Sequence, residues 1–514
     1  MPLPVLQPSR VTVMIKPMGA VCNLDCDYCY YLPTQVLYGG QEKRMSLETL
    51  ESIFATVLPN FADEVTIAWQ GGEPTLAGLD FFKKAIEFQD KYRRPNQRVG
   101  HALQTNGTCL DDDWCRFLAE NNFLIGLSLD GPPHLHDHYR TDRSGRGSHD
   151  QVMRGLHLLR KHNVEHNILC VLNDKNVHHP EEVFRYLLNL GPRFLQFIPA
   201  IEWVQDPDDP RQRTLAPFSP SAEDYGEFLC RVYDLWFERY RTQVSVRLFD
   251  AVLNKLVHGQ SVFCITGESC HTQLTIEHDG SVFGCDHFVE PRWRLARIDD
   301  PEWTNAVNVD GEHRTPLFLH GKEITDACRD ANQHQRLDSV GDRTGSSADD
   351  ETDKKADDWF HRVDQERMGM FAQRKQDLPP ECGTCEYLAY CYGGCPKHRA
   401  HGGDTTEKTA LCAGYQRFFE HAMPGLRWLA GYVRRGMAPP PPEPVNTPTP
   451  VPAGRTAPGP TSRSAASTPR AAGVPPRSTR GGAAVAAPPR TRAPGRNDPC
   501  PCGSGLKHKK CCGR

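Results

Sequence analysis

Apolar and polar residues alternate along the first half of the chain with two different periods. Short runs rich in apolar and β-branched residues lie at 11–15, 65–69, 101–104, 123–129, 167–172 and 194–198. Stretches with helical spacing separate them, at 46–58, 79–92, 111–120, 150–162 and 180–190. This alternation predicts βα units around a parallel sheet, and therefore an α/β fold. Six such units predict a partial or full barrel with its functional groups at the carboxyl ends of the strands.

The regular alternation stops after about residue 250, and cysteines become dense from Cys264 to Cys412. A polar, charged stretch inside this region has too little apolar content to pack, which predicts a disordered insertion. Farther on, Pro, Ala, Arg, Thr and Ser dominate, as in an extended basic linker. We therefore expect a barrel domain at 1–250 and a cysteine-rich domain at 251–435, with its insertion at about 338–358. A linker at 436–496 and a small terminal module at 497–514 follow.

Composition excludes some classes of protein. A chain of 514 residues is too long for one compact core, and its net charge of −4 creates no general attraction to nucleic acid or anionic membranes. No apolar run approaches the roughly 20 residues that a membrane helix needs. The first residues also lack the apolar segment of a secretory signal. We therefore predict a cytoplasmic protein without membrane spans.

The chain contains twenty cysteines. In a reducing cytosol, clustered cysteines are metal ligands or catalytic thiols more often than disulfides. Fifteen of them fall into tight local groups. The remaining five are interpreted as buried small hydrophobes or bystanders: Cys109, Cys115, Cys170, Cys230 and Cys328.

The first group is a triplet, Cys22, Cys26 and Cys29, in the predicted loop after the first strand. Three thiolates can hold three irons of a [4Fe–4S] cluster and leave the fourth iron open for another ligand. The alternative, a zinc knuckle, needs a fourth ligand nearby, and residues 30–100 contain no Cys or His. The triplet therefore favours a catalytic iron–sulfur cluster.

A second array contains eight cysteines, the complement of two fully ligated [4Fe–4S] clusters. Two zinc sites would use the same number of thiolates, so the spacing leaves both interpretations open. The array consists of Cys264, Cys270, Cys285, Cys382, Cys385, Cys391, Cys395 and Cys412.

The end of the chain carries a third group, Cys500, Cys502, Cys511 and Cys512. Four thiolates so close together fit a structural tetrahedral Zn²⁺, whose binding would drive the folding of so short a segment. A disordered basic tail with reactive thiols is the alternative. The segment resembles the SEC-C motif, in which Cys512 takes a place often held by histidine. Its lysines indicate an acidic partner, nucleic acid or the ribosome.

The cysteine triplet resembles the radical S-adenosylmethionine (SAM) superfamily, because CNLDCDYCY matches the superfamily's cluster loop, including Tyr28. Gly71, Gly72 and Glu73, followed by proline, resemble the GGEP motif that contacts the SAM amino group. Glycines allow close backbone approach, and a carboxylate suits an ammonium.

The same resemblance implies further contacts with SAM. Ser128 would contact the cofactor, and the backbone near Ile201 would meet its adenine. Either Arg140 or Arg154 would pair with the SAM carboxylate, and the sequence leaves both open.

The second array is similar to the SPASM domain, and over roughly residues 10–430 the chain resembles the anaerobic sulfatase-maturating enzymes. This resemblance implies a partial (β/α)6 barrel followed by a SPASM domain, with three [4Fe–4S] clusters in all. A segment between about 305 and 360 departs from the family. The implied auxiliary ligands interleave, as Cys264, Cys270, Cys285 and Cys395 for one cluster and Cys382, Cys385, Cys391 and Cys412 for the other.

Three further residues receive roles from this resemblance. Asp286 would be the general base, while Tyr31 and Gln70 would contact substrate near the reacting carbon. From the residues alone, Asp286 is also consistent with a turn-stabilising aspartate, and Tyr31 and Gln70 with ordinary packing or polar contacts.

The implied activity is that of a radical SAM oxidoreductase. It would convert a cysteine or serine in a C/S-x-P-x-R motif of a sulfatase precursor to Cα-formylglycine, with electrons from flavodoxin or ferredoxin. A 5′-deoxyadenosyl radical would remove the substrate's β-hydrogen, and the second electron would leave through the auxiliary clusters. Two alternatives remain: another SPASM enzyme that crosslinks or epimerises peptides, and a non-catalytic zinc adaptor.

Overall fold

The computed structural model describes residues 10–39, 44–60, 63–206, 208–209, 212–270, 273–298, 365–402, 404 and 406–441. The predicted insertion, nearly all of the predicted linker and the terminal module with its four cysteines lie outside the described residues, as does Cys328.

Six parallel strands form the barrel wall, and the strand–helix alternation predicted from the sequence is confirmed. Each strand pairs with the next along the chain, so the sheet follows chain order from β1 to β6. The strands are β1 (Arg10–Ile15), β2 (Glu64–Trp69), β3 (Arg98–Thr105), β4 (Leu124–Ser128), β5 (His166–Leu172) and β6 (Phe194–Pro199).

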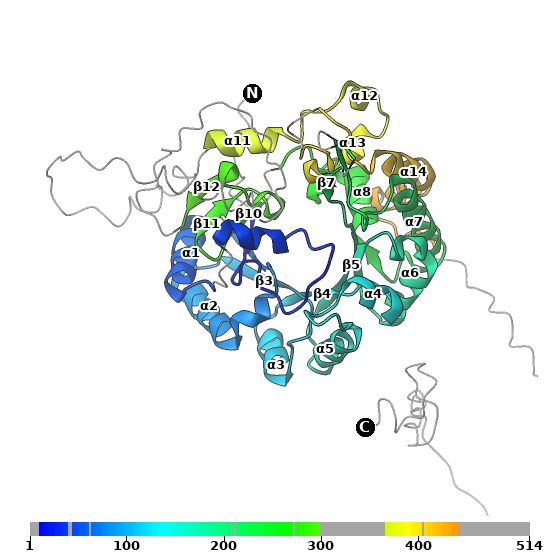
Figure 1. Cartoon of the computed structure of the whole chain (residues 1–514). Helices are drawn as coiled ribbons and strands as arrows, with labels where there is room; N and C mark the ends of the chain where they lie inside the picture. Colours follow the sequence, from blue (N-terminus) through cyan, green and yellow to red (C-terminus); the bar gives the residue numbers. More distant parts are fainter. Residues whose placement is uncertain are drawn as a thin grey trace, which may run out of the picture. The chain divides into compact units, whose positions relative to one another are not determined.

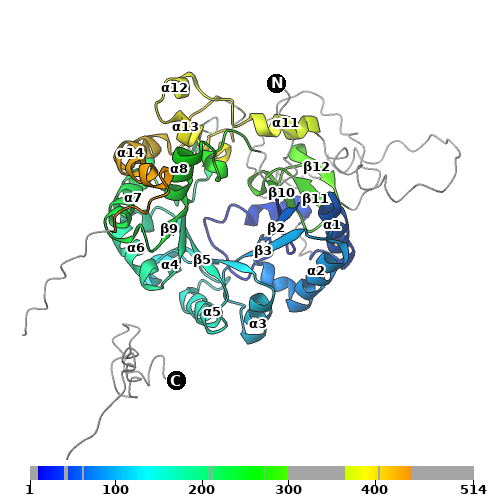
Figure 2. The same cartoon turned by 180° about the vertical axis from the view of Figure 1, so that it is seen from behind.

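Helices cover the outer side of this curved sheet (Figure 1), and the reverse view agrees (Figure 2). Each turns an apolar face inward, as a helix on a sheet must. The helices of the barrel and of the segment that follows it are α1 (Leu47–Asn60), α2 (Leu79–Tyr92), α3 (Asp112–Glu120), α4 (Pro133–Tyr139), α5 (His149–Lys161), α6 (Pro180–Asn189), α7 (Ala222–Leu235) and α8 (Arg247–His258).

The cysteine-rich segment continues the barrel sheet. Strand β10 (Gln273–Ile276) pairs in parallel with β1, and its Ile276 lies beside Ile15. Antiparallel strands β11 (Ser281–Phe283) and β12 (Arg294–Arg297) follow, and β9 (Ser245–Val246) ends the other side of the ten-stranded sheet. Because parallel neighbours end at the same edge, this pairing brings the residues that follow β10 to the carboxyl end of β1.

A two-stranded ribbon, three short helices and one long helix, α14, complete the strands and α-helices of the described chain. They comprise the ribbon of β7 (Trp203–Gln205) and β8 (Arg213–Leu215), then α11 (Gln365–Gln373), α12 (Pro380–Gly383), α13 (Leu388–Cys391) and α14 (Cys412–Arg434). The long helix α14 packs lengthwise against α7. None of the helices in the described part of the chain combines the length and apolar character needed to cross a bilayer.

Two glycines allow α7 and α14 to approach closely. A Cβ atom on Gly414 would lie 2.3 Å from the Ala222 carbonyl oxygen, and one on Gly226 would lie 2.8 Å from the Gly414 Cα. Both neighbours are backbone and cannot rotate away. The contact places Cys412, at the start of α14, against the rest of the domain.

We expect Gly414→Ala to destabilise the domain by about 1–3 kcal/mol, the usual cost of overpacking. Gly431→Ala on the same helix is the matched control, because a Cβ there would meet only the Arg435 side chain, at 3.5 Å. Thermal unfolding of the two variants measures the effect: a lower Tm for Gly414→Ala alone is expected. Equal Tm values would contradict the close packing.

Candidate active site and cysteine centres

The cysteine triplet occupies the loop after β1, as predicted. Within it the Cys29 amide donates to the Cys26 carbonyl at 2.9 Å. All three thiols are free, and burial raises the pKa of Cys22 and of Cys26 to about 12. Thiols with so high a pKa become thiolates only when a positively charged group, such as the irons of an iron–sulfur cluster, compensates the thiolate charge. The residues present therefore fit such a group.

The Gly-Gly-Glu turn after β2 is bound directly to the triplet loop. The Gly72 amide donates to the Gly19 carbonyl at 2.8 Å, and the Glu73 amide donates to the Val21 carbonyl at 2.9 Å. A Cβ on Gly72 would lie 2.1 Å from the Val21 oxygen. Gly71 has φ 129°, a conformation that favours glycine. The two motifs identified in the sequence thus form one backbone unit.

The Glu73 side chain is fully buried and braces this unit against β3. Its Oε1 accepts hydrogen bonds from the Thr75 amide at 3.0 Å and the Thr105 hydroxyl at 2.8 Å, and its Oε2 accepts from the Asn106 amide at 2.8 Å. The Asn106 side-chain amide then reaches Asn23 at 2.9 Å, next to Cys22. The predicted contact of Glu73 with the SAM amino group stays a prediction.

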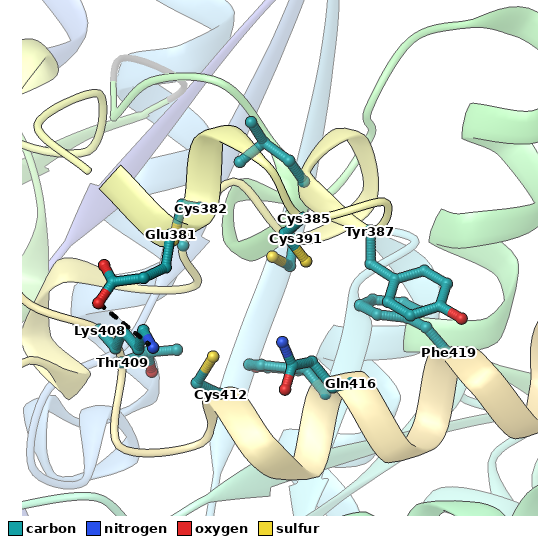
Figure 3. Close-up of a pocket in the computed structure, with 13 residues that line it drawn as sticks. Glu381, Cys382, Cys385, Tyr387, Cys391, Lys408, Thr409, Cys412, Gln416 and Phe419 are labelled. Atoms are coloured by element: carbon teal, nitrogen blue, oxygen red, sulfur yellow. Dashed lines mark ion pairs between the residues drawn. The ribbon is translucent and has the colours of Figure 1, made fainter. Parts of the chain in front are cut away.

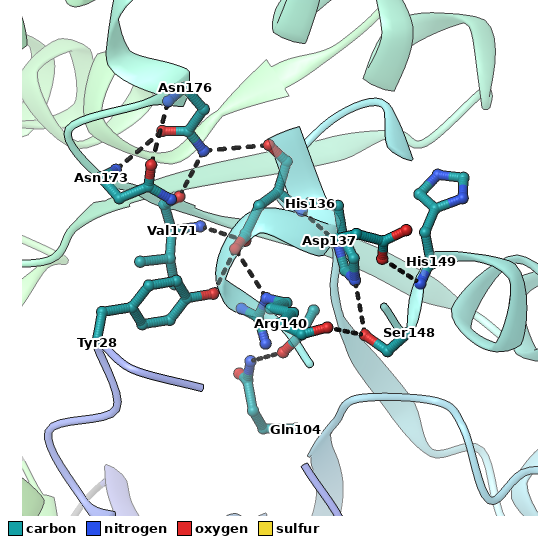
Figure 4. A network of polar contacts seen from close by, with 12 residues as sticks. Tyr28, Gln104, His136, Asp137, Arg140, Ser148, His149, Val171, Asn173 and Asn176 are labelled. Atoms are coloured by element: carbon teal, nitrogen blue, oxygen red, sulfur yellow. Dashed lines mark hydrogen bonds and ion pairs between the residues drawn. The ribbon is translucent and has the colours of Figure 1, made fainter. Parts of the chain in front are cut away.

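Asp130, after β4, is buried and accepts hydrogen bonds from Tyr28, Arg140 and Val171, three residues labelled in the polar network of Figure 4. Its Oδ2 accepts from the Tyr28 hydroxyl and, at 2.8 Å, from Arg140 Nε. Its Oδ1 accepts from the Val171 amide at 2.9 Å. Asp130 therefore ties the cysteine loop to two neighbouring strands.

The two arginines that the sequence left open have different surroundings. The Arg140 guanidinium lies 5.5 Å from the centre of the Tyr28 ring in the triplet loop, and it is the strongest influence that opposes the raising of the Cys26 pKa by burial. Arg154 instead donates from Nη2 to the Thr108 carbonyl. The other predicted SAM contacts, Ser128 and Ile201, are both buried, and the Ser128 hydroxyl accepts from a glutamine of β3.

Asp286 is buried beside Lys16, the residue that directly follows β1. Its Oδ2 accepts from the Tyr30 hydroxyl at 2.5 Å and lies 3.5 Å from Lys16 Nζ, while its Oδ1 accepts from Gln273 at 3.4 Å. Burial alone would raise the pKa of the Asp286 carboxyl, but the Lys16 ammonium and the Tyr30 hydrogen bond outweigh it and hold the pKa below its usual range. The carboxylate is therefore kept ionised by Lys16 and oriented by Tyr30 and Gln273.

Lys16 connects the three residues predicted to act on substrate. Besides its ion pair with Asp286, its Nζ donates to Gln70 Oε1 at 3.1 Å and lies 4.0 Å above the centre of the Tyr31 ring. The Tyr31 hydroxyl donates to Glu277 Oε1 at 2.6 Å. The structure thus brings Asp286, Gln70 and Tyr31 together.

Lys16, Tyr30 and Glu277 are not among the residues that the sequence predicts. Lys16 has a signal in the sequence, because it directly follows the apolar run of β1. A charged residue at the end of a buried parallel strand is unusual. Glu277 has none, because its position beside β1 depends on the long-range pairing of β10.

The eight cysteines of the second array separate into two spatial sets. In the first set, burial raises the pKa of Cys264, Cys270 and Cys285, and Cys395 raises it further in each case, after Asp286 for Cys285. In the second set, the sulfur atoms of Cys385, Cys391 and Cys412 point into one cavity (Figure 3), which Cys382 also lines. These are the sets that the resemblance implies.

The chemistry of both sets fits an iron–sulfur group, since each gathers four thiols with no disulfide among them. Within the described ranges, no three His, Cys, Asp or Glu side chains are arranged to hold a single metal ion. Of the cysteines predicted to stand apart, Cys115, Cys170 and Cys230 are buried and Cys109 is half-buried.

Two family models match the chain. The model of the radical SAM superfamily covers residues 17–187, which include the triplet and the Gly-Gly-Glu turn. The SEC-C motif covers residues 496–514.

Several relatives match far more of the chain. The serine-type anaerobic sulfatase-maturating enzyme of Bacteroides thetaiotaomicron is 31% identical over 83% of this chain and 93% of its own length. The cysteine-type enzyme of Clostridium perfringens is 32% identical over 82% and 99%. A solved structure of native anSMEcpe with bound AdoMet and the Cp18Cys peptide has a TM-score of 0.65 and 31% identity over 82% of this chain and 99% of that one.

The barrel, the triplet and the superfamily match define a radical SAM enzyme, which binds SAM and iron–sulfur clusters. The chain belongs to the family of anaerobic sulfatase-maturating enzymes. The family, the fold class and the enzyme class predicted from the sequence are confirmed. The roles of individual residues and the number of clusters stay predictions.

Proposed function

We propose that this protein oxidises a cysteine or serine of a sulfatase precursor to Cα-formylglycine. The observation that carries the proposal is the buried Asp286 carboxylate, which lies with Tyr31 and Gln70 around Lys16 at the strand end next to the triplet loop. Serine-type and cysteine-type relatives are equally similar to the chain, so both target residues belong to the proposal.

Three [4Fe–4S] clusters are proposed, one at Cys22, Cys26 and Cys29 and one at each set of four cysteines. At the triplet, the cluster and SAM would supply the radical that removes a hydrogen atom from the substrate's β-carbon. Gly71, Gly72, Glu73, Ser128 and Ile201 would line the SAM site. A buried site of this kind also shields reactive species from water.

Asp286 would take the thiol or hydroxyl proton of the target residue, which must leave for an aldehyde or thioaldehyde to form. Lys16 keeps this carboxylate ionised, and Tyr30 holds its orientation by a 2.5 Å hydrogen bond. Tyr31 and Gln70 would contact the peptide beside the reacting carbon.

Arg140 is proposed as the partner of the SAM carboxylate, because its guanidinium lies over the ring of Tyr28 in the triplet loop while its Nε pairs with Asp130. Arg154 instead donates to the Thr108 carbonyl. We expect Arg140→Met to weaken SAM binding roughly tenfold or more, since a charge-assisted hydrogen bond contributes about 1.5–3 kcal/mol. Arg154→Met is the control and should bind SAM like the wild type. Equilibrium binding to iron-reconstituted protein measures both, and a loss of affinity confined to Arg154→Met would contradict this choice.

The experiment that tests the function uses the full chain, reconstituted with iron and sulfide and chemically reduced. It is incubated with SAM and a peptide of about eighteen residues bearing a C/S-x-P-x-R core. Mass spectrometry should detect a peptide aldehyde together with deoxyadenosine. A crosslinked or epimerised peptide would favour the alternative SPASM activities, and a colourless protein containing only zinc would favour the adaptor.

The remaining proposals concern partners. The segment 497–514 is proposed to bind one Zn²⁺ through Cys500, Cys502, Cys511 and Cys512, which its match to the SEC-C motif supports. An acidic protein, nucleic acid or the ribosome is its proposed partner, and flavodoxin or ferredoxin the proposed electron donor of this cytoplasmic enzyme.

A further inference from the structure

Three positively charged side chains are buried around the first set of four cysteines. Lys375 is 1% exposed, Arg399 0% and Arg374 5%. Lysine and arginine are almost never so deeply buried unless an opposite charge compensates them. Their partners therefore indicate what the site around these cysteines is built to hold.

Lys375 is fixed by three hydrogen bonds to carbonyl oxygens of the cysteine loops. Its Nζ donates to the carbonyls of Cys264 at 2.9 Å, Ile265 at 2.8 Å and Gly394 at 2.8 Å. All three donor hydrogens are used, so the ammonium cannot swing out to solvent. The charge thus stays next to the loops that carry Cys264 and Cys395.

Arg399 is held in the same way by backbone carbonyls. Its Nη1 donates to the carbonyls of Arg374 at 2.9 Å and Asp377 at 3.0 Å, and its Nη2 to that of Lys375 at 3.2 Å. The two cations therefore belong to one rigid unit.

Neither Lys375 nor Arg399 forms an ion pair with a carboxylate of the described residues, whereas Arg374 pairs with Asp404 at 2.9 Å. Burial lowers the pKa of Lys375, and the charges that oppose it are the thiolates of Cys270, Cys395 and Cys264. Burial likewise lowers the pKa of Arg399, and Cys395 and Cys270 oppose this more strongly than the Asp377 carboxylate does. Because Lys375 is bonded to the Cys264 carbonyl and to the Gly394 carbonyl next to Cys395, thiolates formed at these cysteines when a cluster binds would supply its counter-charge.

The second set of cysteines has a different electrostatic environment. The lysine nearest to it, Lys408, has a side chain that is 49% exposed and lies 3.8 Å from the Glu381 carboxylate. Such a charge is screened by water and by its partner. Arg399 also lowers the pKa of Cys382 in the second set, but less strongly than burial and the thiols of Cys412 and Cys385 raise it.

We propose that Lys375 and Arg399 raise the reduction potential of the [4Fe–4S] cluster held by Cys264, Cys270, Cys285 and Cys395, making it the acceptor of the substrate's second electron. The proposal rests on the function proposed above. In that step the β-carbon radical loses one electron, the thiol or hydroxyl proton goes to Asp286, and the cluster is reduced by one electron. A fixed positive charge stabilises the more negative, reduced cluster, and net charge is among the factors that set such potentials.

The test measures the midpoint potential of each cluster in the reconstituted full chain by a redox titration followed by electron paramagnetic resonance. Lys375→Gln and Arg399→Gln remove one charge each while keeping hydrogen-bond donors. Each should lower the reduction constant of this cluster at least tenfold, about 59 mV for one electron. Arg399→Lys keeps the charge and should retain the wild-type potential.

Lys408→Gln is the matched control on the second set and should leave all potentials unchanged. The proposal is overturned if both glutamine variants keep the wild-type potential, if Arg399→Lys shifts it as far as Arg399→Gln does, or if both glutamine variants lose this cluster's iron. Failure of the proposed function looks different: the wild-type chain would form no aldehyde, although the shifts in potential would still be seen.

Discussion

Replacing Asp286 with asparagine is expected to lower the yield of peptide aldehyde by about 10²–10⁴-fold, the range that a positioned general base contributes. An amide can still accept the hydrogen bond from Tyr30, but it cannot take up the substrate proton. The three cysteines of the triplet and the residues around SAM are unchanged. SAM cleavage to deoxyadenosine and the iron content should therefore stay at wild-type levels.

Asp279→Asn is the matched control for this variant. Asp279 lies on the hairpin between β10 and β11, where it accepts 3.0 Å hydrogen bonds from the Ser281 amide and hydroxyl. We expect it to form aldehyde at the wild-type rate. Mass spectrometry of the peptide and chromatography of deoxyadenosine, run on the same samples, separate the two steps. An undiminished aldehyde yield from Asp286→Asn would remove this residue from the proposed chemistry.

Replacing Gly72 with alanine is expected to cost the protein the cluster of the triplet, about four irons per chain. The added Cβ would lie 2.1 Å from the Val21 carbonyl oxygen, and the three atoms nearest to it are all backbone atoms of Ala20 and Val21. The loop that carries Cys22 must move away, and the hydrogen bonds from Gly72 and Glu73 to that loop break with it. SAM cleavage should fall to background.

Gly100→Ala on the exposed side of β3 is the control, because nothing lies within 4 Å of its added Cβ. Iron analysis and the cluster's absorption should match the wild type in that variant. If Gly72→Ala kept its full iron content and cleaved SAM normally, the backbone contact between the two motifs would not be needed for the cluster.

The barrel could be predicted because its signal is local. Each of the six strands is a short apolar run, and an amphipathic helix follows each of the first five. The observed strand bounds differ from the prediction by at most three residues, at β3. The triplet and the Gly-Gly-Glu turn are equally local, since their residues are close in the chain. Their hydrogen bonding to each other could not be predicted, because nothing in either motif shows which loop carbonyls the turn meets.

The cluster of Asp286, Lys16, Gln70 and Tyr31 shows which part of the site local patterns could not predict. Asp286 could be assigned from its place after Cys285, yet its charge state depends on Lys16, 270 positions earlier in the chain. That contact exists because β10 pairs with β1 in one particular register. The choice between Arg140 and Arg154 is of the same kind, because only their contacts in the folded chain distinguish them: Arg140 lies over Tyr28, and Arg154 donates to the Thr108 carbonyl.

By itself, the sequence determined the chemistry available to this protein: an α/β barrel, three thiolates at iron-binding spacing, eight more thiolates, and a turn suited to SAM. These properties depend on residue type and on spacing over a few positions, and both can be read from the sequence without knowledge of the fold. The family resemblance already implied how the eight cysteines divide into two sets, whereas only the tertiary structure showed which charged side chains surround each set. Interleaved cysteines and buried cations such as Lys375 and Arg399 come from distant segments, and their proximity is created by packing rather than by any local pattern.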